Sequence, residues 1–114
     1  MTEAPAITIR LPARLWAGID ANLDNAVDLA IMDGDDATAD LGTAIRETGS
    51  GQVPWVDGRW PPREQELRIT LDEAHWSFVL DHLQRSRASY ERLGDHESLQ
   101  LGQDTIEAVR RQLS

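Results

Sequence analysis

The sequence contains no cysteine, and all eleven of its basic residues are arginine, so it also lacks lysine. Without cysteine the chain can form neither disulfide bonds nor thiolate metal sites, and without lysine it cannot form a Schiff base with a carbonyl substrate. No apolar run approaches the ~18–20 residues that a membrane-spanning helix needs. Residues 1–6 also lack the basic and apolar regions of a secretory signal. We therefore expect no membrane contact and a cytoplasmic location.

Positive charge is scarce as well. Twenty carboxylates outnumber the eleven arginines, which gives a formal net charge of −9. Nine of these carboxylates but only three arginines fall in residues 1–50. This charge opposes attraction to nucleic-acid phosphates and to anionic lipid, and it suits either a basic partner or solubility alone. The abundance of arginine, alanine, glycine and aspartate is typical of a GC-rich bacterial genome.

The sequence contains an internal repeat with a period of 60 residues. The stretches 7–23 and 67–83 match without a gap, and the match continues to residue 50. The identical pairs are Ile9/Ile69, Leu11/Leu71, Trp16/Trp76, Leu23/Leu83, Gly34/Gly94, Asp35/Asp95, Leu41/Leu101, Gly42/Gly102 and Glu47/Glu107. Nine identities in the 44 positions from 7 to 50 predict two copies of one structural unit.

Each copy is predicted to form a strand and then two helices. Residues 7–11 and 67–71 alternate apolar and polar side chains, as a half-buried strand does. Pro12 suits the first turn of the following helix, and Asp72 is a good N-cap in the second copy. The glycines at 34 and 94 suit a left-handed helix end.

Apolar residues recur at helical spacing along all four predicted helices. The second helices are expected over about residues 37–48 and 97–113, the former closed by Gly49, Ser50 and Gly51. The side chains predicted to face inward include Leu15, Trp16, Ile19, Leu23, Ala26, Val27, Ala30, Ile31, Leu41, Ala44, Ile45, Trp76, Val79, Leu80, Leu83, Tyr90, Leu93, Leu99, Ile106, Val109 and Leu113. Trp16 and Trp76 are therefore predicted to pack in the core.

These elements predict a single, mostly helical α+β domain over residues 1–114. Repeat one covers 7–50, a connector covers 51–65, and repeat two covers 66–114. A lone strand leaves its backbone polar groups unpaired, so we expect the two strands to form an antiparallel ribbon. The two copies are then related by a pseudo-two-fold axis. The sequence leaves open whether the protein is a monomer or a homodimer.

The connector breaks the repeat. Trp55 and Trp60, each next to a proline, flank the dipeptide Asp57-Gly58, which is typical of tight hairpin turns. Proline on both sides keeps the segment out of a sheet, so we expect an irregular hairpin or loop across the core. The two tryptophans either cap the core or form an exposed anchor for a partner.

The first long helix carries a row of carboxylates. Asp20, Asp24 and Asp28 follow one another at a spacing of four, with no arginine between them on that helix. Like charges at this spacing cost about 0.2–0.5 kcal/mol per pair. Asp35 and Asp36 extend the negative region. The row is interpreted either as a surface for a basic partner, including mimicry of nucleic-acid phosphate, or as a solvated face.

Catalytic and metal-binding patterns are missing. His75 and His82 lie seven residues apart, whereas helical zinc ligands are usually three or four apart and need further ligands. The aspartates that begin at Asp33 do not match a calcium-binding loop, because the twelfth position is Ala44. No nucleophile elbow or phosphate-binding loop is present. We therefore predict a non-enzyme without a metal or other cofactor.

Residues 7–12, followed by Leu15 and Ile19, resemble the opening of ribbon-helix-helix DNA-binding proteins. In that family two antiparallel strands place their outward side chains in the major groove. The resemblance implies that the corresponding residues here are Thr8, Arg10, Arg68 and Thr70.

Our leading hypothesis is a small, acidic, non-catalytic accessory protein that binds another protein, with a basic partner expected from the charge. The residues assigned to this surface are Asp20, Asp24, Asp28, Asp35, Asp36, Trp55 and Trp60. The alternative hypothesis is a DNA-binding regulator that uses the strand pair. A small ligand between the two copies is a third possibility.

Overall fold

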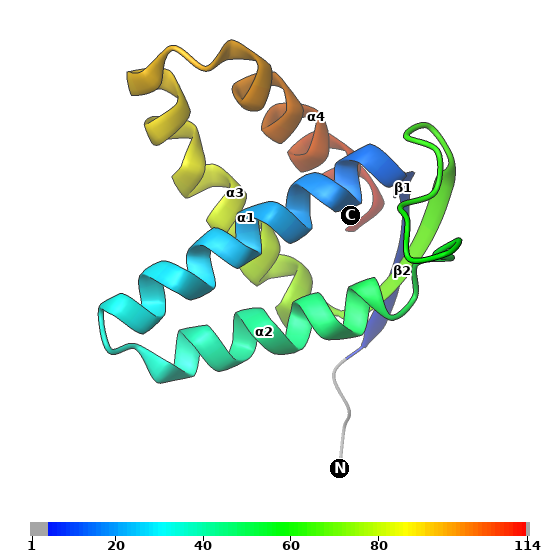
Figure 1. Ribbon diagram of the computed structural model, residues 1–114, viewed down its shortest axis with the longest axis horizontal. Coiled ribbons are helices and arrows are strands. Elements are labelled where there is room, and N and C mark those ends of the chain that lie inside the picture. Colours follow the sequence, from blue (N-terminus) through cyan, green and yellow to red (C-terminus); the bar gives the residue numbers. More distant parts are fainter. Residues whose placement is uncertain (1–4, 114) are drawn as a thin grey trace.

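The computed structural model describes residues 5–113, which form two strands and four helices. The elements in chain order are β1 (Ala6–Pro12), α1 (Ala13–Met32), α2 (Asp36–Ser50), β2 (Glu66–Asp72), α3 (Glu73–Leu93) and α4 (His96–Leu113). Figure 1 shows the antiparallel ribbon of β1 and β2 at one side of the helices. The predicted mostly helical α+β fold with a two-stranded ribbon is thus confirmed. None of the helices in residues 5–113 is both long and apolar enough to cross a membrane.

The ribbon pairs the two strands in a register centred on Ile9 and Ile69, which lie opposite each other. Its inward side chains are buried against the helices, as the alternating pattern predicts. Trp16 and Trp76 are both fully buried, with an edge-to-face contact at a ring-centroid distance of 6.5 Å. The indole Nε1 of Trp76 also donates to the carbonyl oxygen of Ile7 at 2.9 Å. The prediction that both tryptophans pack in the core is confirmed.

Aspartate side chains cap the starts of α2 and α3, and of these two caps only Asp72 was predicted from the sequence. Asp35 accepts a hydrogen bond from the Thr38 backbone N–H, and Asp72 accepts one from the His75 backbone N–H. Both contacts satisfy N–H groups that the first helical turn leaves without an intrahelical partner. Pro12 lies one residue before the helix, as the last residue of β1.

The predicted end of α2 is wrong by two residues, because the helix continues through Gly49 to Ser50. The physical reason is the packing of Trp16 against this turn. A Cβ atom at position 49 would lie 2.1 Å from Cζ2 of Trp16, so only glycine leaves room for the indole. This contact offsets the poor helix propensity of glycine.

Three side chains predicted to face inward are instead exposed, namely Ile31, Ala44 and Leu93. Leu93 is exposed because it is the last residue of α3. Ala44 is exposed because Gly42, Ile45 and Gly49 form the buried stripe of α2, and position 44 falls on the opposite face. Ile31 is 60% exposed because it follows Ala30, the last buried residue of α1. The corrected stripe of α1 therefore ends one residue before Ile31.

A glutamine side chain is hydrogen-bonded to the outer edge of each strand of the ribbon, at one residue per strand. Gln52 accepts a hydrogen bond from the backbone N–H of Thr70 and donates to its carbonyl oxygen, both at 2.8 Å. Gln112 does the same with the backbone of Arg10, at 2.8 and 2.7 Å. Each amide thus satisfies a donor and an acceptor that a two-stranded sheet leaves without a partner.

Candidate functional site

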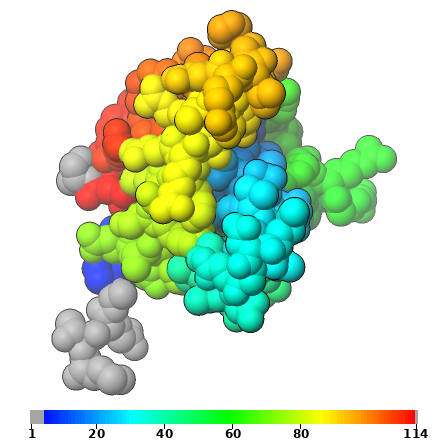
Figure 2. Space-filling model, turned by 90° about the vertical axis from the view of Figure 1, so that its left-hand side faces the viewer, coloured from blue at the N-terminus to red at the C-terminus, as the bar shows by residue number. Residues whose placement is uncertain are grey.

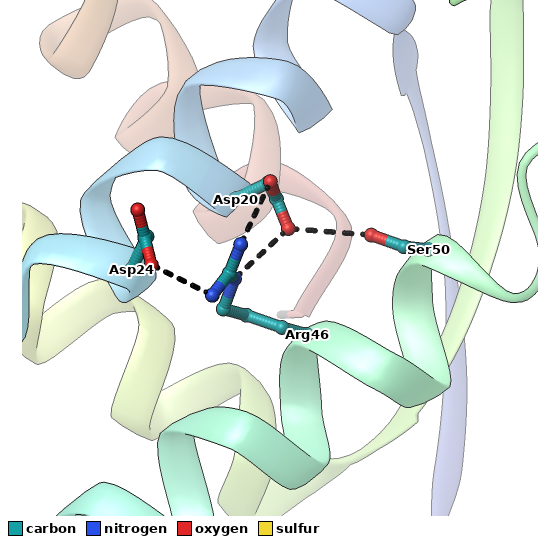
Figure 3. A network of polar contacts seen from close by, with 4 residues as sticks. All are labelled: Asp20, Asp24, Arg46 and Ser50. Carbon is teal, nitrogen blue, oxygen red and sulfur yellow. Dashed lines mark hydrogen bonds and ion pairs between the residues drawn. The ribbon is translucent and has the colours of Figure 1, made fainter. Parts of the chain in front are cut away.

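Arg46 of α2 lies between the first two aspartates of the predicted row (Figure 3). Its Nε lies 3.2 Å from Oδ1 of Asp20, and its Nη1 lies 2.9 Å from Oδ1 of Asp24. The hydroxyl of Ser50 also donates to Asp20 at 3.3 Å. The hydrogen bond with Asp20 is the main cause that raises the pKa of Arg46 above its usual value. Two of the three aspartates in the row are therefore paired with an arginine from the neighbouring helix, whereas Asp28 has no such partner in residues 5–113.

Part of the protein's unpaired negative charge lies near the turn between α1 and α2. Asp28, Asp33 and Asp36 are exposed, and none forms an ion pair within residues 5–113. Three apolar side chains lie among them, with exposed fractions of 52% for Leu29, 60% for Ile31 and 81% for Met32. We call these six residues, Asp28, Leu29, Ile31, Met32, Asp33 and Asp36, the acidic tip.

Asp35 lies beside the acidic tip but has a structural role. Its carboxylate accepts hydrogen bonds from the Thr38 hydroxyl at 2.7 Å and from the Thr38 backbone N–H at 3.1 Å. These bonds, the hydroxyl contact first, lower the pKa of Asp35. The Asp35 carboxylate is therefore an N-cap for α2.

A groove of about 700 Å³ lies beside the acidic tip, between α1, α2 and α3. Figure 2 shows this side of the molecule, with the cyan end of α1 next to the yellow α3. Leu29, Leu41 and Phe78 contribute apolar lining, and Asp33 and Asp81 contribute carboxylates. The groove thus combines apolar side chains with carboxylates, one of which, Asp81, is paired with Arg85 of the same lining.

His82 also lines this groove, and its ring stacks on Phe78 at a centroid distance of 4.2 Å. Burial, followed by the nearby positive charge of Arg85, lowers the pKa of His82. Its imidazole is therefore neutral at neutral pH and does not add positive charge to the groove.

Trp55 and Trp60 lie on a short hairpin in the connector. A single bridge pairs Val56 with Arg59, and the turn between them uses positive φ values at Asp57 and Gly58. The two indoles are in contact at a centroid distance of 4.4 Å with their planes tilted by 51°, and each residue is 41% exposed. The hairpin projects from the body of the molecule (Figure 2). Of the two alternatives for these tryptophans, the structure therefore favours exposure.

The residues assigned to one partner surface do not come together. Figure 1 places the turn between α1 and α2 at the far end of α1 from the connector. The acidic tip and the tryptophan hairpin are therefore separate surfaces, and one short peptide does not contact both.

The outer face of the ribbon presents the residues implied by the ribbon-helix-helix resemblance. Thr8 and Thr70 lie opposite each other, and their hydroxyl oxygens are hydrogen-bonded at 2.6 Å. Arg10 and Arg68 are also paired across the ribbon, and both are exposed. Two arginines and two threonines are thus adjacent on one surface.

The two helical histidines do not share a metal site. His75 approaches Asp72 at 3.5 Å, whereas His82 stacks on Phe78. Within the described part of the chain, no group of three histidine, aspartate or glutamate side chains is arranged to hold a metal ion. Comparison of the chain with family models, curated proteins and solved structures gives no match.

The sequence did not indicate the role of Arg46, because Arg46 and Asp20 lie 26 residues apart on different helices. The exposure of Ile31 and Met32 was missed because helical spacing does not reveal where a neighbouring helix ends. The equivalence of Gln52 and Gln112 can be found from the sequence, because the 60-residue period aligns these two identical residues just beyond the matching stretch, which ends at residue 50.

Proposed function

We propose that this protein is a non-catalytic binding protein whose acidic tip recognises a basic segment of another protein. The observation that carries the proposal is the set of exposed apolar side chains, Leu29, Ile31 and Met32, among unpaired carboxylates. Apolar side chains supply most of the binding free energy when they are desolvated. The surrounding carboxylates select the charge of the partner and speed its approach.

The distribution of charge over the chain supports the same proposal. Residues 1–50 hold nine carboxylates. Among the described residues, Arg46 forms ion pairs with Asp20 and Asp24, and not with the carboxylates of the acidic tip itself. The tip therefore stays strongly negative at neutral pH. A basic segment that carries one or two large apolar residues matches this surface in both charge and polarity.

The test is selection of peptides from a displayed random library on the immobilised protein. We expect the enriched peptides to combine arginine or lysine with large apolar residues. Their affinity should fall at least tenfold, which corresponds to about 1.4 kcal/mol, when Asp28, Asp33 and Asp36 are all changed to asparagine. Met32→Ser should weaken binding as well, because it removes apolar contact area.

The matched control changes Glu66, Glu91 and Glu107 to glutamine, which removes the same charge from elsewhere on the surface. Peptides that bind equally to both triple variants would show that only net charge matters. Enriched peptides without basic residues, or no enrichment at all, would contradict the proposal.

A second candidate function is DNA binding by the outer face of the ribbon. The observation that favours it is the exposed pairing of Arg10 with Arg68 beside the two threonines. Its test is an electrophoretic mobility shift at low salt with random-sequence duplex DNA. A shift that is weakened by Arg10→Ala and Arg68→Ala supports it, whereas no shift at low salt removes it.

We also propose that the chain is a duplicated unit with pseudo-two-fold symmetry. The strand register centred on Ile9 and Ile69 supports this, because the two residues correspond under the 60-residue period. The paired contacts of Gln52 with Thr70 and of Gln112 with Arg10 are related by the same offset.

The turns between the helices support the duplication further. Gly34 has a φ of 75° and Gly94 a φ of 68°, and each is followed by an aspartate that caps the next helix. The two units also differ, because Nε1 of Trp76 donates to a carbonyl oxygen, whereas the buried Nε1 of Trp16 has no partner.

A further inference from the structure

A second cavity, distinct from the groove beside the acidic tip, lies where the connector meets α1 and α4. Its volume is about 420 Å³, within the range of small-molecule sites. On α1 it is lined by three small residues, Ala13, Ala17 and Gly18, and by Arg14. Leu101 of α4 and Trp60 of the connector contribute larger apolar groups.

The connector is fixed in place beside this cavity. The backbone N–H of Ala13 donates to the carbonyl oxygen of Gln65 at 2.8 Å, and the backbone N–H of Arg14 donates to the carbonyl oxygen of Arg63 at 3.0 Å. The indole of Trp60 contacts the tilted ring of Trp55, whose Nε1 donates to the Ser50 carbonyl oxygen at 2.9 Å. The aromatic part of the lining is therefore pre-organised, which lowers the entropy cost of binding.

The structure as described leaves one guanidinium of the cavity unpaired, that of Arg63, which points to an anionic ligand. Arg14 is already paired with Glu64 at 2.9 Å. The guanidinium of Arg63 has no ion-pair or hydrogen-bond partner within residues 5–113, although it lines the cavity. The lining also contains Glu97, so Glu64 and Glu97 together balance the two guanidinium groups, and the group left to bind a ligand is the guanidinium of Arg63. An arginine fork is well suited to bind a carboxylate.

We propose that this cavity binds a small planar aromatic carboxylate. The ring packs between Trp60 and the small residues of α1, and the carboxylate accepts hydrogen bonds from Arg63. A planar ring fits because indole and small aliphatic side chains offer flat apolar surface. This site is independent of the acidic tip, so its failure and the failure of the proposed protein binding are separately measurable.

The test is a titration of the ¹⁵N-labelled protein with indole-3-acetate, followed through the four indole N–H resonances. We expect saturable shifts for Trp60 and its neighbour Trp55, with a Kd below about 1 mM, and no shift for the buried Trp16 and Trp76. Indole-3-acetamide, which is neutral, and tryptamine, which is a cation, should each bind at least fivefold more weakly.

Two variants on the exposed connector complete the experiment. Arg63→Gln should weaken indole-3-acetate binding at least fivefold and abolish the preference over indole-3-acetamide. Arg59→Gln is the matched control, because Arg59 belongs to the same connector but does not line the cavity, and it should bind as the natural sequence does. Absence of a saturable shift, a preference for tryptamine, or equal effects of the two variants would overturn the proposal.

Discussion

At the scale of single residues, the most demanding position is Gly49. Its Cα lies against the buried ring of Trp16, so an added Cβ would come within 2.1 Å of Cζ2 and 2.2 Å of Cη2. Tryptophan in a closed core has few alternative rotamers, and neighbouring groups must move to admit even one methyl group.

We therefore predict that Gly49→Ala lowers the free energy of unfolding by about 1–3 kcal/mol, despite the better helix propensity of alanine. Gly102→Ala is the control, because a Cβ there meets no atom within 4 Å, and it should stabilise the protein by up to about 1 kcal/mol. Urea denaturation followed by circular dichroism measures both. Equal effects at the two positions would contradict the packing argument.

Arg46 is the second decisive residue, because its guanidinium joins α1 to α2. We predict that Arg46→Ala lowers the free energy of unfolding by about 1–2 kcal/mol at low salt. Without the guanidinium, Asp20, whose side chain is only 22% exposed, loses its ion pair, and its carboxylate is repelled by the carboxylate of Asp24. The loss of stability should shrink as salt is added.

Arg85→Ala is the comparison for Arg46. Its ion pair with Asp81 is of similar length, 3.0 Å, but lies exposed on α3. Its loss should cost no more than about 0.5 kcal/mol in the same denaturation experiment. If both substitutions cost the same, the Arg46 pair has no special structural role.

At the scale of secondary structure, the glutamine contacts determine how firmly the ribbon is held. We predict that Gln52→Ala and Gln112→Ala each lower stability by about 1 kcal/mol and speed hydrogen exchange of one amide. The affected amide is that of Thr70 for Gln52→Ala and that of Arg10 for Gln112→Ala. Gln103→Ala, an exposed change on α4, should alter neither amide. A uniform rise in exchange across all variants would argue against local edge contacts.

The elements that the sequence predicts well are those set by local pattern. Alternation located both strands within a residue or two, and Gly34 and Gly94 marked the helix ends because few other residues tolerate a positive φ. The end of α2 was missed because a contact with Trp16, 33 positions away in the sequence, decides it. For the same reason the sequence placed the carboxylate row correctly but not Arg46, its partner across the helix pair.

At the scale of the whole molecule, the proposed duplication predicts that the second unit can pair with itself. A chain of residues 61–114 should form a helical homodimer in which two copies of β2 pair antiparallel about Ile69. Analytical ultracentrifugation and circular dichroism test this, with Ile69→Asp as the variant that should not dimerise, because it places a charge at the centre of the interface. An unfolded monomer at every concentration tested would contradict the prediction.

The glutamine contacts at the edges of the ribbon also limit how a partner can be recognised. Many proteins capture extended peptides by letting them join an open sheet as an extra strand. Here an incoming strand would first have to displace the amide of Gln52 or Gln112, which already makes the two backbone hydrogen bonds at Thr70 or at Arg10 that the peptide would offer. Recognition by this molecule is therefore expected to rely on side chains at its helices and connector, and not on β-augmentation.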